Sequence, residues 1–365
     1  MAPLGAQGWV ARRLDARALS DQDLVAASFA GRIAEQEERL LSPLATRSYP
    51  ALREHGEQDC ALRTPFQRDR DRIVHSKAFR RLTHKTQVFV APQGDHYRTR
   101  LTHTLEVTSI SRTVARALRL NEDLVEAIGL GHDLGHPPFG HIGEEVLDAC
   151  LKERFGSDFR HYEHSLRVVA CLERGGLGLN LTEQVREGIA RHSSRTPQPH
   201  TLEGRIVRVI DRVAYINHDI DDAVRAGLLR EQDLPSEPIA VLGESGSARI
   251  DALVHDMVEH SQLAGDIVQG PLAGPAMSEL RDFMFERVYL GPAVRAEREK
   301  IEAVVRRLFE HYVEHPELLP GGADDAQPGD DLELAQRVTD YLAGMTDRYC
   351  IREYTELQVP RAFAR

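Results

Sequence analysis

One stretch organises this chain, and it reads Gly131-His132-Asp133-Leu134-Gly135-His136-Pro137-Pro138-Phe139-Gly140-His141. Just upstream, Asn121 can cap a helix whose apolar residues follow helical spacing. The two prolines cannot continue that helix, so it should end near His132 and Asp133, and a second helix should follow from about 142 to 151. Neutral imidazole and carboxylate are ligands that suit divalent first-row metals. Because a solvated turn has no need of three histidines, this turn indicates a metal site.

The composition is that of a globular protein that can bury a large core. The chain has 365 residues and 41% hydrophobic residues, enough for one large domain or two. No apolar run approaches the ~18 residues of a membrane helix, and the start of the chain has no signal-peptide pattern. The four cysteines are far apart without a CxxC pair, which favours reduced thiols in a cytoplasmic protein.

Charge is distributed unevenly along the chain. The formal net charge is −11, which argues against binding nucleic acid over the whole surface. Arg63 to Arg119, however, contains 13 Lys or Arg and 4 Asp or Glu, a balance of 13 − 4 = +9, so the remainder carries −11 − 9 = −20. A basic segment in an acidic chain suggests a confined anionic ligand such as phosphate. On composition alone, surface salt bridges are the better explanation for most of these arginines.

The periodicity predicts an all-α fold with at most one small β-hairpin, at residues 87–90. Three parts are expected: an N-terminal helical extension over 1–60, a core over 61–230 and a C-terminal helical region over 231–365. Loops are expected at 235–248 and 320–331, where Gly, Ser, Pro or Asp accumulate. The expected helices span about 17–42, 65–82, 98–118, 142–154, 162–174, 182–191, 201–227, 249–260, 275–288, 293–313 and, as the last one, 331–345.

Two further residues have the chemistry of metal ligands. His103 shares a helical face with the apolar residues Val107, Ile110 and Val114, so it should point towards the core. Asp211 interrupts an apolar helix, where burial without a partner would be costly. Each has a simpler explanation: His103 as a core histidine bonded to a backbone carbonyl, and Asp211 as the partner of a neighbouring arginine at the surface. Together with His132 and Asp133 they would hold a divalent cation and leave positions open for water or phosphate.

The ordered pattern His103, His132-Asp133 and Asp211 resembles that of the HD-domain metal-dependent phosphohydrolases. Within them the chain resembles the deoxynucleoside triphosphate triphosphohydrolase (dGTPase-like) family. The resemblance extends over most of the chain after residue 60. It is carried by the segments 67–76, 79–88, 97–103, 132–140 and 211–222, with shorter matches at 277–289 and 345–349.

The resemblance implies hydrolysis of a dNTP, dGTP or others, to deoxynucleoside and inorganic triphosphate. It implies a divalent cation, Mn or Mg first and Fe, Co, Ni or Zn as alternatives, held by His103, His132, Asp133 and Asp211. His141 and Glu144, three residues apart at a helix start, would be the proton-transfer pair. His136 and His161 would line the phosphate tunnel, with His164 as the alternative to His161.

The same resemblance assigns substrate contacts. Arg100 and Arg212 would bind phosphate, and Tyr215 and Asp219, one and two turns beyond Asp211, would receive the sugar. Asp219 would contact the 3′-hydroxyl and Tyr215 would crowd a 2′-hydroxyl. Arg281 and Tyr289 are implied as a distal phosphate and sugar pair, and Gln87 as a base- or sugar-edge contact, or else all three are ordinary helix residues. Some relatives are activated by a second dNTP and form hexamers or tetramers; nucleic-acid binding has weaker support, and no membrane partner is expected.

Two other classes of function compete with this one. An HD phosphodiesterase or 5′-nucleotidase would act on nucleotides without a triphosphate, but it leaves the basic segment before His103 and the Tyr215/Asp219 pair unexplained. A non-catalytic nucleotide sensor or single-strand DNA binder would not need to retain four metal ligands together with His141. The sequence therefore favours the triphosphohydrolase.

Overall fold

The computed structural model describes residues 22–87, 98–320 and 331–360. Across these residues the fold is helical, without a β-sheet, and the two isolated β-bridges pair Arg53 with Thr182 and Thr86 with Thr99. The prediction of an all-α fold is therefore confirmed. The strand predicted from Gln87 onward and the loop predicted at 320–331 fall almost entirely outside the described residues.

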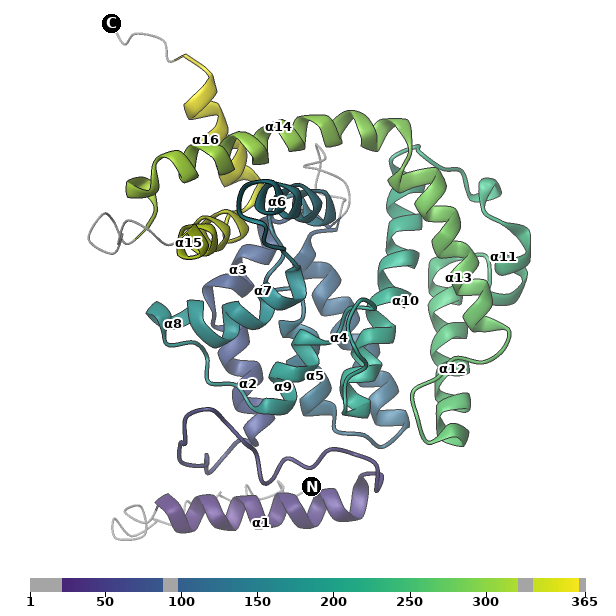
Figure 1. The fold of residues 1–365 in the computed structure, drawn as a ribbon. Coiled ribbons are helices and arrows are strands. Elements are labelled where there is room, and N and C mark those ends of the chain that lie inside the picture. Colours follow the sequence, from purple (N-terminus) through teal and green to yellow (C-terminus); the bar gives the residue numbers. More distant parts are fainter. Residues whose placement is uncertain (1–21, 88–97, 321–330, 361–365) are drawn as a thin grey trace, which may run out of the picture.

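Helix α5 lies at the centre of the main bundle (Figure 1). It precedes the turn from His132 to His141, which we call the HD turn. The side chains of Leu124, Val125 and Ile128 are fully buried, and the side chain of Asn121 caps the helix by accepting from Leu124 N at 3.2 Å. The helices that make up this bundle are α2 (Pro65–Val74), α4 (Arg100–Ala117), α5 (Glu122–Gly131), α9 (Glu183–Ala190) and α10 (Leu202–Arg225). The bundle is what places the end of α5 deep inside the protein.

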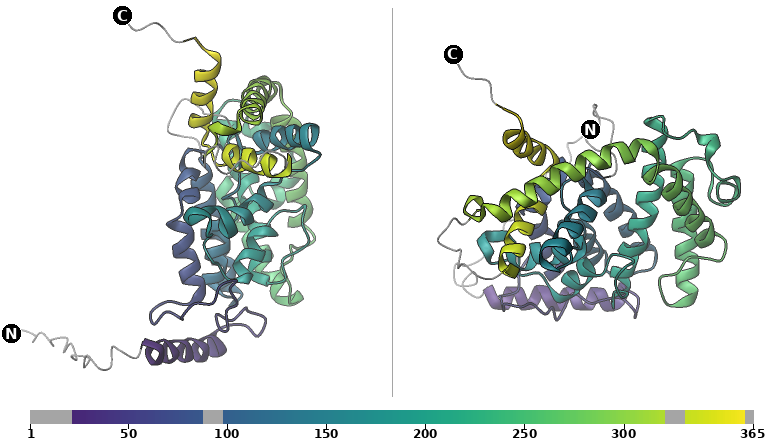
Figure 2. Two further views of the ribbon diagram at one scale, coloured as in Figure 1. Left: turned by 60° about the vertical axis from the view of Figure 1, so that its left-hand side comes forward. Right: turned by 45° about the horizontal axis from the view of Figure 1, so that its top comes forward.

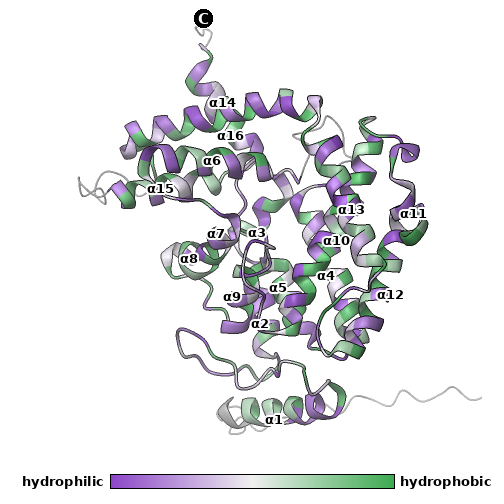
Figure 3. Ribbon diagram, turned by 45° about the vertical axis from the view of Figure 1, so that its right-hand side comes forward, coloured by the Kyte–Doolittle hydropathy of each residue, from purple (hydrophilic) through white to green (hydrophobic). Residues whose placement is uncertain are grey.

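Two further hydrophobic clusters extend the bundle on two sides (Figure 1). The C-terminal helices cover α6, and the second half of α10 packs against a group of three helices. Figure 3 shows hydrophobic and hydrophilic residues alternating along α14 and along α10 and its neighbours, as expected of helices with one buried face. These helices are α6 (Gly140–Phe155), α14 (Pro292–Glu314), α15 (Asp331–Ala343) and α16 (Asp347–Gln358) in one cluster, and α11 (Ser236–Leu242), α12 (Gly246–Ala264) and α13 (Ala273–Met284) in the other.

The remaining elements are one long helix and several short ones. Helix α1 (Gln22–Leu40) runs along one edge of the molecule, as both views in Figure 2 show. The short helices are α3 (Lys77–Arg81), α7 (His161–Arg167) and α8 (Glu173–Gly176). The single turns are the 3₁₀ turns η1 (Leu82–His84), η3 (Glu231–Asp233) and η5 (Pro316–Leu318) and the π turns η2 (Val168–Leu172) and η4 (Phe285–Tyr289).

Three predictions about helices were wrong. The single helix predicted over 65–82 is broken at His75, because Ser76 caps a new helix by accepting from Phe79 N at 3.1 Å. The loop predicted at 235–248 contains α11, whose proline, Pro238, lies in the first turn, where a helix tolerates it. The helix predicted at 331–345 is not the last, since Thr346 caps α16. The predicted division into three parts stays a prediction.

The described residues contain no helix with the length and apolar character needed to cross a membrane.

The HD turn packs directly against α7, because the backbone of Gly135 lies close to the backbone of Ser165. Gly135 N donates to Ser165 Oγ at 2.9 Å, and Ser165 Oγ donates to the carbonyl of His132 at 2.8 Å. A Cβ atom at position 135 would lie 2.1 Å from Ser165 N. Glycine is therefore required here by contact with another helix, and this contact fixes the turn that carries His132 and Asp133.

Gly135→Ala is expected to destabilise the protein by about 1–3 kcal/mol or more, because backbone atoms must move apart to admit the methyl group. Urea unfolding followed by circular dichroism measures the change in free energy of unfolding. Gly31→Ala is the control, since a Cβ there meets nothing within 4 Å in a helix, and it should be neutral or stabilising by up to ~1 kcal/mol. Equal effects of the two changes would show that the contact at Gly135 is unimportant.

Candidate metal centre and active site

In the HD turn, the Nε2 atom of His132 has no hydrogen-bond partner in the protein. The Nδ1 of His132 donates to the carbonyl of Gly129 at 2.7 Å, so Nε2 carries the lone pair of the neutral ring. That Nε2 atom is buried and has no hydrogen-bond partner, and it faces carboxylate oxygens of Asp133 at 3.5 Å and Asp211 at 3.7 Å. A buried lone pair surrounded by carboxylates is unfavourable unless a cation lies between them. The residues present therefore fit a divalent metal ion.

The structure brings all four predicted metal ligands together from three elements. His103 from α4, His132 and Asp133 offer ligand atoms within 4.8 Å of one another. Asp211 from α10 joins them, with Oδ1 at 3.0 Å from the Nε2 of His103. The simpler explanations do not describe the structure, because His103 contacts a carboxylate and the nearby Arg208 donates to backbone carbonyls of residues 191, 196 and 197.

Arg100 is a direct partner of the metal-site aspartate. Its Nη1 donates to Asp133 Oδ2 at 2.7 Å, and both side chains are at least 95% buried. Although burial opposes the charged form of Asp133, the positive charges around it, including Arg100, hold its pKa well below the usual range. The pKa of Asp211 is likewise lowered, against burial, by the hydrogen bond to His103. Both carboxylates are thus ready to bind a cation.

A second group of polar side chains lies beside the metal ligands. The rings of His136 and His161 stack at a centroid distance of 3.9 Å and an interplanar angle of 13°. Glu144 accepts from Nδ1 of His161 at 2.9 Å and lies 3.3 Å from Nδ1 of His141. Burial opposes ionisation of Glu144, but these histidines lower its pKa strongly. Glu144 is therefore an anion that orients two imidazoles.

His141 is poised to carry a proton. Its side chain is 64% exposed. Desolvation lowers the pKa of His141, but the hydrogen bond and the charge of Glu144 outweigh it, so the pKa is raised above the ordinary 6.5.

One cavity of about 460 Å³ collects most of the predicted site residues. His103 and His132 lie beneath its wall, and the Asp219–Tyr289 pair is also set back from it. The predicted residues that line the cavity are Gln87, Arg100, Asp133, His136, His141, Glu144, His161, Asp211, Arg212, Tyr215 and Arg281. A volume of this size suits a small organic ligand of nucleotide dimensions.

The residues predicted to bind the sugar stand in one row along α10. Tyr215 follows Asp211 by one turn, and burial raises its pKa above the ordinary range. Asp219 lies one turn further, accepts a short hydrogen bond from the hydroxyl of Tyr289, and has its pKa raised by burial to about 7. Residues 219 and 289 thus contact each other, although they are 70 positions apart. Arg281 is at the cavity wall, where it pairs with the adjacent Asp282 at 2.9 Å.

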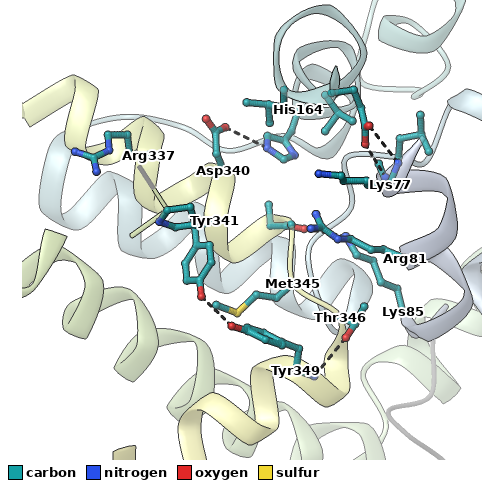
Figure 4. Close-up of a pocket in the computed structure, with 18 of the residues that line it drawn as sticks. Lys77, Arg81, Lys85, His164, Arg337, Asp340, Tyr341, Met345, Thr346 and Tyr349 are labelled. Atoms are coloured by element: carbon teal, nitrogen blue, oxygen red, sulfur yellow. Dashed lines mark hydrogen bonds and ion pairs between the residues drawn. The ribbon is translucent and has the colours of Figure 1, made fainter. Parts of the chain in front are cut away.

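His161 and His164, three residues apart on α7, line different cavities. His161 lines the cavity described above, whereas His164 contacts Asp340 at 3.4 Å and lines another cavity, of about 590 Å³, shown in Figure 4. In that view the side chains of Lys77, Arg81 and Lys85 project from one side, opposite Asp340 and Tyr341. The second cavity is larger, but it lacks the His141–Glu144 pair and the four metal ligands. The smaller cavity is therefore the candidate active site.

Three residues that touch this site were not identified from the sequence. His192 is 2% exposed, and its Nε2 lies 3.2 Å from the Nε2 of His161. Lys85 is 3% exposed and donates to the carbonyl of His136 by a short hydrogen bond and to that of Ala343 at 2.8 Å. Asp347 accepts from the backbone N–H groups of Thr86 and Phe139, each at 2.9 Å. No local pattern marks these residues, because their partners are distant in sequence.

Comparison with known proteins agrees with this arrangement. The HD domain matches residues 100–216, and the phosphohydrolase-associated domain matches residues 270–356. The chain is similar to three proteins named deoxyguanosinetriphosphate triphosphohydrolase-like protein. The one from Caldanaerobacter subterraneus subsp. tengcongensis is 50% identical over 89% of this chain and 94% of its own. Those from Desulfatibacillum aliphaticivorans and Clostridium perfringens are 46% and 47% identical, over 89% and 85% of this chain and 97% and 91% of their own.

The HD domain is all-helical, as this fold is, and the family is one of hydrolases. Identity of this level over nearly the full length of both chains, with the HD residues gathered at one cavity, shows that the chain belongs to the deoxyguanosinetriphosphate triphosphohydrolase-like family of HD-domain hydrolases.

Proposed function

We propose that this protein hydrolyses deoxynucleoside triphosphates, dGTP among them, to deoxynucleoside and inorganic triphosphate. One observation carries the proposal. The set His103, His132, Asp133 and Asp211 adjoins the same cavity as the His141–Glu144 pair. Cation ligands and a proton donor on one cavity are what phosphate-ester hydrolysis requires.

Charge and position assign the parts of the reaction. The four ligands would hold a divalent cation, Mn or Mg, which polarises a phosphate and lowers the pKa of a bound water. Arg212 at the cavity wall would neutralise phosphate charge. His141, held by Glu144, would donate its proton to the departing 5′-oxygen at the α-phosphorus. The bond broken would be the one between the α-phosphorus and that oxygen.

The row on α10 accounts for a deoxyribose. Tyr215 lines the cavity one turn from the metal ligand Asp211, and Asp219 lies one turn beyond it. A sugar with its 5′-oxygen near the metal would lie against the Tyr215 ring, which would crowd a 2′-hydroxyl. Activation by a second dNTP and assembly into hexamers or tetramers remain proposals that rest on the family resemblance.

Asp211→Ala and His141→Ala are expected to fail in different ways. The first removes a ligand and should lose both the catalytic cation and turnover. The second should abolish turnover while nucleotide still binds, because His141 moves a proton and does not hold phosphate. Phosphorus NMR of the products and titration calorimetry with a dNTP measure the two effects. Wild-type rates in both variants, or release of phosphate or pyrophosphate in place of triphosphate by the wild type, would contradict the proposal.

The pH dependence follows from the raised pKa of His141. The protonated form is the active acid, so kcat should be highest below the folded pKa and fall as pH rises through it, at a value above the ordinary 6.5. Glu144→Gln removes the charge that raises this pKa and should move the alkaline limb to lower pH. A pH–rate profile of both proteins checks this, and an unchanged alkaline limb in the variant would exclude His141 as the acid.

Tyr215→Ala is expected to relax sugar selection. Removing the ring opens space for a 2′-hydroxyl, so the ratio of kcat/KM for dGTP over GTP should fall by roughly 10- to 100-fold. Triphosphate release from each nucleotide measures the ratio. Tyr354→Ala on the distant helix α16 is the control and should leave the ratio unchanged. If Tyr215→Ala also left the ratio unchanged, the sugar would have to be selected elsewhere.

A further inference from the structure

His161 and His192 direct two lone pairs at each other. The Nδ1 of His192 lies 2.7 Å from the carbonyl oxygen of Ile189, which can only accept, so Nδ1 carries the proton. The Nδ1 of His161 lies 2.9 Å from both oxygens of the ionised Glu144, so it too carries the proton. In the neutral rings both Nε2 atoms therefore have lone pairs, and these atoms are 3.2 Å apart. Two facing lone pairs repel unless something positive lies near both.

Asp133 supplies a third ligand at the same point. Ligand atoms of Asp133, His161 and His192 all lie within 4.8 Å of one another, and the three residues are 4%, 8% and 2% exposed. Asp133 Oδ2 is bound by Arg100, whereas Oδ1 faces the imidazoles of His132 and His136. All three residues line the cavity, so an ion held by them would keep positions open towards a ligand.

We propose that Asp133, His161 and His192 form a second divalent-cation site, which shares Asp133 with the first. Two imidazole nitrogens and one carboxylate oxygen suit a first-row ion such as Mn, Fe, Co or Zn. The sites are adjacent, since the ring centroids of His132 and His192 are 5.0 Å apart. The Ile189 carbonyl and Glu144 accept from the Nδ1 atoms of His192 and His161, so the Nε2 atoms are left free to bind metal. Metal-binding histidines usually have such a partner at the other ring nitrogen.

The neighbouring group of His136, His141, Glu144 and His161 is a poorer candidate, although its ligand atoms are equally close. The rings of His136 and His161 are stacked nearly parallel, so their in-plane lone pairs do not converge. Glu144 is already used by His161 N, His161 Nδ1 and His141. The Asp133–His161–His192 group is the better candidate because His192 is not part of the stacked pair and its Nε2 lies next to Nε2 of His161.

A second cation deepens the proposed function, on which its role in catalysis rests. Two divalent ions would be bound by two carboxylates, Asp133 and Asp211, and with the nearby Glu144 also counted the group would still carry a net positive charge at the cavity wall. Such a pair can stabilise the attacking oxygen and the leaving oxygen of a phosphate displacement together. His161 would then act on phosphate through the ion that it holds.

Metal stoichiometry tests the site independently of turnover. The purified full chain is stripped with chelator, saturated with Mn²⁺, dialysed against a low free concentration of Mn²⁺ and analysed for bound metal. Two Mn per chain are expected for the wild type and one for His192→Gln, while the exposed His200→Gln should keep two. Electron paramagnetic resonance of the wild type should show a magnetically coupled Mn pair.

One Mn per chain in the wild type, with an uncoupled six-line spectrum, would overturn the proposal and leave a shared proton between the two histidines. Two Mn in His192→Gln would overturn the assignment of His192. If that variant does not fold, the wild-type stoichiometry and spectrum decide. Triphosphate release is measured separately, so two bound Mn without triphosphate would refute the proposed function and leave the second site intact.

Discussion

The contact between Gly135 and Ser165 is the constraint on which the active site depends. Because residue 135 has no side chain, the backbone of α7 lies against the HD turn, and Ser165 bonds to the turn on both sides. This contact orients His132 and Asp133 towards His103 on α4 and Asp211 on α10. It also brings His161, on the same short helix as Ser165, to face the cavity. One close approach thus joins the candidate metal ligands to the group of His136, His161 and Glu144.

Local sequence signals were enough to predict most of the helices. The cap at Asn121 and the apolar spacing of α4, α5 and α10 each gave the right element at nearly the right bounds. The errors occurred where a cap competes with a periodic pattern. Ser76 divides a helix that looks continuous, and Thr346 starts one where the apolar pattern seemed to end. Such a choice depends on packing with distant helices, which one sequence does not display.

The candidate site shows the same division between local and distant information. The HD turn is recognisable from its composition, since three histidines and an aspartate lie within eleven residues. The convergence of His103 and Asp211 on it could be expected because neither residue suits an apolar helix face alone. His192 could not be assigned, since its value as a ligand comes from the Nε2 of His161, 31 positions earlier. The burial of Lys85 could not be predicted either, because a lysine in a basic segment is expected at the surface unless its two carbonyl partners are known.

Lys85 and Asp347 join the C-terminal helices to the loop beside the candidate active site. Lys85 spans from the loop carbonyl of His136 to the end of α15, and Asp347 holds the backbone at Thr86 and Phe139 from the start of α16. Without α15 and α16, the buried amino group of Lys85 would lose one of its two carbonyl acceptors, and the backbone N–H groups of Thr86 and Phe139 would lose their carboxylate partner. These bonds couple the position of the last two helices to the loop that carries His136 and Phe139, so a change in the packing of α15 or α16 is transmitted to that loop.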